Sequence, residues 1–117
     1  MDESLPWEIS FYVEDNGVSP VADFFSALPL DAQKHILEKM ERLARQNTTA
    51  RFPLVDHLEG KLWELRAGCH NNPYRFIYCL GRDQYIVFFH GFHKKTQKTP
   101  RRELKIAITR YNRYLTR

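Results

Sequence analysis

The sequence predicts an α+β fold in which helices lie beside a mostly antiparallel sheet. Three observations carry this prediction: an early strand-like segment, two stretches of helical apolar spacing, and three successive strand-like segments before a last amphipathic helix. The length of 117 residues fits one domain over 1–117. A chain of this size can bury a core without disulfides or a structural metal.

The N-terminal half is expected to form a strand and a helical hairpin. Residues 7–13 (WEISFYV) are aromatic and β-branched, as strands are. A serine and a proline, typical of a helix start, introduce a helix over 20–28. Asp31 can cap a second helix, whose apolar residues recur at helical spacing through residue 44. Residues 47–60 contain turn-forming residues and are predicted to be a connecting loop.

The C-terminal half is expected to form three strands and a helix. Residues 61–67, 74–80 and 85–92 are the strand candidates, and the near-continuous apolar character of the third predicts a central, doubly covered strand. Gly81-Arg82-Asp83 is a turn signal. Thr99-Pro100 predicts the start of an amphipathic helix. The predicted order is therefore β-α-α-β-β-β-α.

The charge of the chain is unevenly distributed. The net charge is +4, but residues 1–59 carry a balance of −6 and residues 60–117 a balance of +10. This asymmetry predicts one surface suited to a polyanion, against the alternative of a solvated basic face with no partner. No apolar run is long enough for a membrane helix and the N-terminus lacks the pattern of a secretory signal, so we expect a cytoplasmic protein without a membrane partner.

Metal, redox and cofactor motifs are missing. The two cysteines, Cys69 and Cys79, form no CxxC pair and are expected to be free thiols. His90 and His93 have an H-x-x-H spacing, but on a strand these positions face opposite ways, so no metal site is predicted. No glycine-rich phosphate loop is present, and no cofactor is expected.

Two arginines are the first candidates for a catalytic site. Arg66 and Arg75 lie at comparable positions on strands expected to pair, so both guanidinium groups can point to one face of the sheet. Each guanidinium is a fork of donors suited to phosphate. The alternative is a pair of exposed arginines held by Glu64 or Glu59.

A histidine, a carboxylate and a group of cations complete the candidate site. His93, nearer the exposed basic segment than His90, is the better candidate for proton transfer. Lys94 and Lys95 cannot both be core residues, so one or both are expected to meet solvent or phosphate. Glu64 shares a predicted face with Arg66 and can hold an arginine or, if desolvated, act as a base. The basic residues expected to bind nucleic acid are Lys61, Lys95, Lys98, Arg101 and Arg102.

Three segments resemble a known family. LEGKLWELR (58–66), YRFIY (74–78) and HGFHKKTQKTPRRELKIA (90–107) are similar to the phage-associated HigB-like branch of the RelE/ParE toxin superfamily. The run from Gly91 to Pro100 is the most specific part. The resemblance implies a RelE-like fold and no metal or cofactor. It also implies a cognate helix-turn-helix antitoxin of the HigA kind, which would form a hetero-oligomer with the toxin.

The resemblance also implies roles for individual residues. Arg75 matches the arginine that many RelE-like nucleases place at the scissile phosphate, and Arg66 matches a second basic strand position. Lys94 or Lys95 falls where the last strand of the fold usually supplies a basic residue. Glu64 departs from the family, which often has a lysine near that place.

The expected function is therefore that of a type II toxin acting as a ribosome-dependent mRNA endonuclease. The RNA 2′-OH would attack the adjacent phosphorus, with His93 or Glu64 as the base. Two alternatives stay open: a ParE-like toxin that binds DNA gyrase, and a non-catalytic phage regulator that binds RNA or protein.

Overall fold

A computed structural model describes residues 5–68, 71–95 and 98–117. Cys69, expected to be a free thiol, lies outside these residues. The elements, in chain order, are β1 (Glu8–Phe11), α1 (Pro20–Ser26), α2 (Leu30–Gln46), β2 (Val55–Glu59), β3 (Leu62–Arg66), β4 (Tyr74–Leu80), β5 (Tyr85–His93) and α3 (Arg101–Leu115). Short 3₁₀ turns lie at Asn47–Thr49 and Arg82–Gln84.

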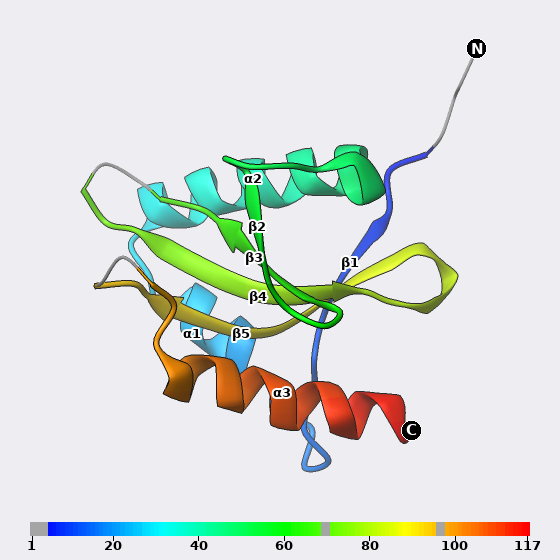
Figure 1. Cartoon of the computed structure of the whole chain (residues 1–117). Coiled ribbons are helices and arrows are strands. Elements are labelled where there is room, and N and C mark those ends of the chain that lie inside the picture. Colours follow the sequence, from blue (N-terminus) through cyan, green and yellow to red (C-terminus); the bar gives the residue numbers. More distant parts are fainter. Residues whose placement is uncertain (1–4, 69–70, 96–97) are drawn as a thin grey trace.

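The strands form one sheet in the order β1-β5-β4-β3-β2. Strand β1 is parallel to β5, and the other neighbouring pairs are antiparallel. Helices α1 and α2 contribute to the core on one face of the sheet, and α3 covers the other face (Figure 1). The predicted α+β architecture with a mostly antiparallel sheet is confirmed, and it is consistent with a RelE-like fold.

Alternation along β4 divides the interior into two cores. Tyr74, Phe76 and Tyr78 pack on the α2 side, whereas Ile77 and Cys79 pack on the α3 side. Both faces of β5 are buried as well, which confirms its predicted central position. Burial raises the pKa of the Cys79 thiol to about 12, so this cysteine is a core residue and not a reactive one.

Strand β2 corrects the predicted order, because it lies inside the segment expected to be a loop. Its sequence, VDHLE, is polar, and its side chains are mostly exposed beyond Val55. It pairs only with β3, at the edge of the sheet. An edge strand with one buried side chain does not need alternating apolar and polar residues, so its sequence lacks the pattern that identifies a strand.

Two predicted helix caps also differ from the structure. Ser19 does accept a hydrogen bond from the Ala22 N–H, as expected, at 3.3 Å. Asp31, however, lies in the first turn of α2 and accepts from the Ala32 N–H. Thr99 lies outside α3, whose N-cap position is Pro100, and the threonine hydroxyl binds elsewhere.

None of the helices in the described ranges is long and apolar enough to cross a membrane.

Candidate functional site

Arg66 and Arg75 are direct cross-strand partners on β3 and β4. Cross-strand partners point to the same side of a sheet, so both guanidinium groups lie on the face that α3 covers in part. Together with Pro53, Gly68 and Pro73 they line an open cavity of about 370 Å³. The predicted juxtaposition of the two arginines is confirmed.

Arg75 is nearly buried, with 9% of its side chain exposed. Its Nη1 donates to the Tyr74 carbonyl oxygen at 3.0 Å, and its buried Nε has no hydrogen-bond partner among the described residues. Burial lowers the pKa of Arg75 below its ordinary value, an effect that Glu64 opposes and the charge of Arg66 reinforces. Arg75 is therefore a cation that a well-placed anion would stabilise.

Arg66 is more accessible to solvent than Arg75, and it contacts the segment that precedes β2. Its Nη1 donates to the Pro53 carbonyl oxygen at 3.1 Å, and its guanidinium lies 4.6 Å from the centre of the Phe52 ring. These contacts orient the fork and leave Arg66 as the solvent-facing member of the pair.

Glu64 is a fully buried carboxylate between two cations. Its Oε2 lies 3.8 Å from Arg75 Nε and 3.6 Å from Lys94 Nζ. Its Oε1 accepts a hydrogen bond of 2.6 Å from the Thr99 hydroxyl. Both carboxylate oxygens are thus engaged, and the residue is 1% exposed. The geometry fits the role of holding an arginine better than the role of a base.

Lys94 and Lys95 have different environments at the end of β5. The Lys94 N–H donates to the Pro73 carbonyl oxygen, and its side chain is 9% exposed beside Glu64. Lys95 is exposed. Of the two lysines, Lys94 therefore joins the buried cluster with Arg75, and Lys95 meets solvent.

His93 does not join this cluster. Its ring lies 5.3 Å from that of Tyr74, on the opposite face of the sheet from Glu64 and Arg75. The next residue, Lys94, faces the cluster because neighbouring strand residues alternate. His93 is exposed, but its ring points away from the arginine pair.

His90 is part of a network that the sequence did not indicate. Its Nε2 lies 2.6 Å from Glu103 Oε1, and Arg110 Nη1 donates to its Nδ1 at 3.3 Å. Arg110 in turn contacts Glu14 at 3.4 Å. Burial lowers the pKa of His90 below its ordinary value of 6.5, although the Glu103 hydrogen bond and charge act in the opposite direction. Partners this far apart in the sequence leave no local spacing signal.

The two histidines therefore face different ways, as the strand argument predicted. His90 faces α3 and His93 faces Tyr74. In the part of the chain that the structure describes, no group of three or more His, Cys, Asp or Glu side chains could hold a metal ion. The expectation that the protein uses no metal stays a prediction.

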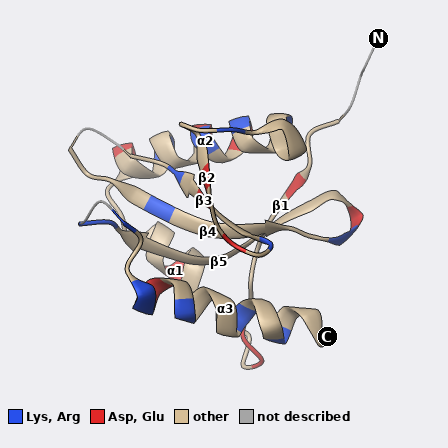
Figure 2. Cartoon of the chain, in the orientation of Figure 1, with Lys and Arg blue, Asp and Glu red and all other residues tan. Residues whose placement is uncertain are grey.

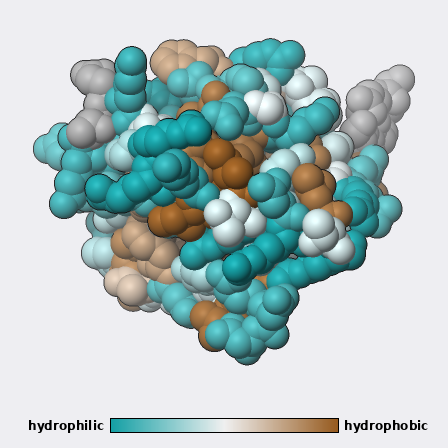
Figure 3. All heavy atoms as spheres, turned by 60° about the horizontal axis from the view of Figure 1, so that its bottom comes forward, coloured by the Kyte–Doolittle hydropathy of each residue, from teal (hydrophilic) through white to brown (hydrophobic). Residues whose placement is uncertain are grey.

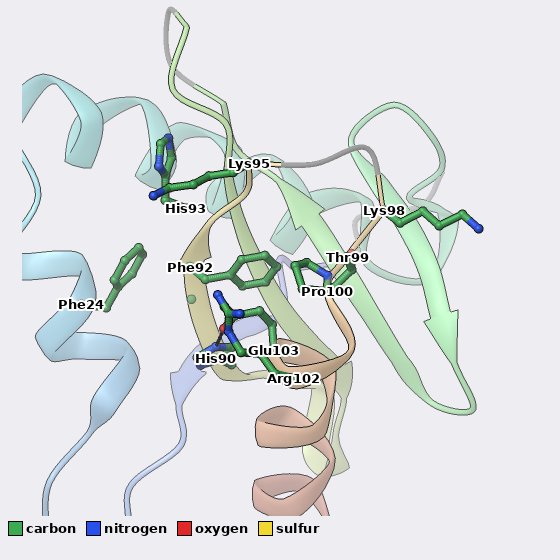
Figure 4. Close-up of a pocket in the computed structure, with 11 residues that line it drawn as sticks. Phe24, His90, Phe92, His93, Lys95, Lys98, Thr99, Pro100, Arg102 and Glu103 are labelled. Atoms are coloured by element: carbon green, nitrogen blue, oxygen red, sulfur yellow. Dashed lines mark hydrogen bonds and ion pairs between the residues drawn. The ribbon is translucent and has the colours of Figure 1, made fainter.

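A cavity of about 700 Å³ lies between α1, the end of β5 and the start of α3 (Figure 4). Its lining includes Lys95, Lys98 and Arg102, three of the residues expected to bind nucleic acid. In Figure 2, the ribbon is marked blue for Lys and Arg along the start of α3 and beside the end of β5. Seen from the α3 side, hydrophobic patches alternate with hydrophilic side chains (Figure 3).

The other two predicted nucleic-acid contacts are placed differently. Arg101 is exposed but pairs with Glu59 at 3.1 Å. Lys61 lies at the end of β3 opposite Arg66, beside Arg82 and Tyr114. Lys61 and Arg66 therefore lie at opposite ends of β3, and the binding of nucleic acid by Lys61 stays a prediction.

One protein-family model matches most of the chain. Residues 23–112 match the family model described as phage derived protein Gp49-like (DUF891). The chain belongs to this family. The matched range contains the whole of β2–β5, with Glu64 and both arginines of the pair. It also contains Lys94 and Thr99, which follow β5. No curated protein matches the sequence.

Membership in the Gp49-like family confirms the coarser part of the resemblance, a phage-associated family. The finer placement in the HigB-like branch is not tested by this match and stays a prediction.

Proposed function

We propose that this Gp49-like protein is a HigB-like toxin that cuts mRNA on the ribosome. The observation that carries the proposal is the cross-strand pair Arg66 and Arg75, which lines an open cavity above a buried carboxylate. Two guanidinium forks on one face match the geometry of a phosphodiester. An anion bound there would also supply a partner for the nearly buried Arg75.

The proposed reaction is an attack of the RNA 2′-oxygen on the adjacent phosphorus. The bond from phosphorus to the 5′-oxygen breaks, leaving a 2′,3′-cyclic phosphate and a 5′-hydroxyl. Arg75 and Arg66 stabilise the charge that builds on the phosphorane oxygens. Glu64 positions Arg75 and Lys94 and does not itself touch the RNA.

Neither candidate proton acceptor, Glu64 or His93, lies free beside the arginine pair. Glu64 has both oxygens engaged, and His93 can serve as the base only for an RNA that crosses the end of β5. The ribosome contributes by holding the mRNA in the attacking geometry, which lowers the demand on the protein's own side chains.

The proposal includes a neutralising partner. An antitoxin of the HigA-like helix-turn-helix kind would bind the toxin as a hetero-oligomer and keep it inactive. The positive charge gathered at α3 and β5 favours an acidic segment of that partner (Figure 2).

Cleavage by purified protein on programmed ribosomes tests the proposal. We expect new mRNA 5′ ends with wild type and a rate roughly 10²–10³-fold lower with Arg75→Ala, the cost of removing one charge-stabilising donor. Arg82→Ala, an exposed arginine at the far end of β4, is the matched control and should cut normally. Unfolding curves of both variants separate loss of activity from loss of fold.

Two results would contradict the proposal. Intact mRNA beside a nuclease that cuts in the same assay would exclude ribosome-dependent cleavage. Growth arrest in bacteria without new mRNA ends would favour a gyrase-binding toxin, and normal growth without an antitoxin would favour a binding module.

A further inference from the structure

Among the described residues, no strand pairs with the outer side of the C-terminal half of β5, which is therefore an open sheet edge there. Strand β1 pairs with Tyr85–Phe88 only, and Tyr12 donates one further hydrogen bond to Phe88. Beyond Phe88, the outer side of β5 faces the 700 Å³ cavity that α1 and the start of α3 enclose.

The hydrogen-bond pattern shows which backbone groups face this edge. Ala67 donates to the Tyr74 carbonyl, so Tyr74 turns its backbone toward β3. Antiparallel strands alternate, so Arg75 turns toward β5, and its partner Phe92 turns toward β4. The N–H and C=O groups of Gly91 and His93 therefore point out of the sheet, into the cavity.

The walls of the cavity are aromatic. Phe24 of α1 faces Phe92 and His93 across it (Figure 4). Gly91 makes this arrangement possible, because a Cβ at that position would lie 2.8 Å from the Phe24 ring. Aromatic walls with outward-facing amide groups suit a flat heteroaromatic ring that carries hydrogen-bonding atoms on its edge.

The rim of the cavity is cationic. Lys95 and Arg102 are exposed at its mouth, and Lys98 belongs to the same lining. The carboxylate of Glu103 binds His90 through Oε1 at 2.6 Å and pairs with Arg102 through Oε2 at 3.4 Å, so one acidic side chain faces three basic ones at this rim. The charge at the rim therefore favours a phosphate-bearing ligand over a neutral peptide strand.

The cavity also adjoins the proposed phosphate site. Thr99 lines it and donates a hydrogen bond to Glu64, the carboxylate that holds Arg75. A strand of RNA whose phosphate lies near Arg75 can place a neighbouring nucleotide in the cavity.

We propose that this cavity binds one unstacked nucleotide of single-stranded RNA. The base stacks on Phe24, its polar edge meets the backbone of Gly91 and His93, and its phosphate lies between Lys95 and Arg102. The choice of RNA as the ligand rests on the proposed function.

Direct binding of an uncleavable RNA tests this inference. The probe is a 2′-O-methyl hexaribonucleotide of mixed sequence, whose blocked 2′-oxygen cannot attack phosphorus. We expect the imidazole NMR signals of His90 and His93 to shift on titration, while that of His35 on α2 does not.

Two neighbouring phenylalanines provide a matched pair of variants. Phe24→Leu keeps an apolar side chain against the sheet but removes the stacking ring, and should weaken binding roughly ten-fold or more. Phe25→Leu changes the next residue of α1, which packs on the core but does not line the cavity, and should bind like wild type. Backbone amide spectra verify that both variants are folded.

The outcomes separate this inference from the proposed function. Equal affinity of Phe24→Leu and wild type, or histidine signals that do not move, would overturn the nucleotide site even if the protein cuts mRNA. In that case a strand of a partner protein, pairing with the open edge of β5, would be the remaining explanation for this surface. A shifted His93 signal and a Phe24 effect would support the site even if no cleavage were found.

Discussion

At the scale of single residues, Glu64 supplies the negative charge that faces two nearly buried cations. It is the buried acidic side chain between Arg75 and Lys94, each of which is 9% exposed. Removing one member of a buried ion pair costs far more than an exposed pair contributes, because the remaining charges stay desolvated. Glu64 therefore couples the stability of the fold to the position of the proposed phosphate-binding arginine.

Substitution of Glu64 tests this coupling. Glu64→Gln keeps an acceptor for the Thr99 hydroxyl but leaves two buried cations without a counter-charge, and should lower the free energy of unfolding by about 3 kcal/mol. Glu59→Gln breaks an exposed pair with Arg101 and should cost less than about 1 kcal/mol. Urea denaturation measures both. Equal, small losses would mean that water already reaches the two cations.

Residue-level prediction from the sequence succeeded where it depended on strand alternation alone. Arg66 and Arg75 could be placed on one face because both lie near the linked ends of adjacent strands. His93 and Lys94 are neighbours in the sequence, but their side chains point to opposite faces of the sheet, so the separation of His93 from the buried cluster follows from strand alternation and not from sequence distance. The partners of His90 and Glu64 come from α3 and the segment before it, and only the packed structure brings them together.

The contact between α1 and β5 is a close-packed constraint at the scale of elements. Gly91 has no side chain where Phe24 and Phe76 approach the strand, and a Cβ there would lie 2.7 Å from the Phe76 ring. Helix α1 has only seven residues, so it depends on this packing for its position.

A methyl group at Gly91 should therefore displace α1. Gly91→Ala is expected to lower the free energy of unfolding by about 1–3 kcal/mol through overpacking. Gly68→Ala is the control, since its nearest neighbours lie 3.8 Å away and it should change stability little. Thermal unfolding followed by circular dichroism compares them. A Gly91→Ala protein as stable as Gly68→Ala would show that α1 can move away without cost.

Elements with a clear period were predictable, and those shaped by an edge were not. The two long helices have apolar residues spaced about 3.6 residues apart, and the three inner strands have alternating or near-continuous apolar residues. The structure contains each of these elements. Strand β2 buries mainly Val55, so its sequence resembles a loop. Its strand conformation depends on hydrogen bonds to β3, which a local pattern does not encode.

At the scale of the whole molecule, ion pairs join the acidic first half of the sequence to its basic second half. The acidic first half and basic second half do not form two separate surfaces. Glu14 contacts Arg110 and Arg113 at 3.4 and 3.3 Å. Asp15 likewise contacts Arg117 at 2.7 Å. Acidic residues of the first half thus neutralise the C-terminal half of α3. At the start of that helix Arg101 pairs with Glu59 and Arg102 with Glu103, and the exposed Lys95 lies nearby at the cavity rim.

This distribution predicts that a positive side chain at the cavity rim contributes more to RNA binding than one that an acidic residue already neutralises. Binding to single-stranded RNA weakens with salt by a slope of about 0.7 per phosphate contact in a plot of log K against log salt. Lys95→Ala removes an exposed cation at the cavity rim and should reduce the slope by roughly that amount. Arg113→Ala removes an equal charge that Glu14 already compensates, and should leave affinity and slope nearly unchanged. Fluorescence anisotropy with the 2′-O-methyl hexamer at several salt concentrations measures both. Similar losses in the two variants would mean that net charge, and not its arrangement around the start of α3, governs RNA binding.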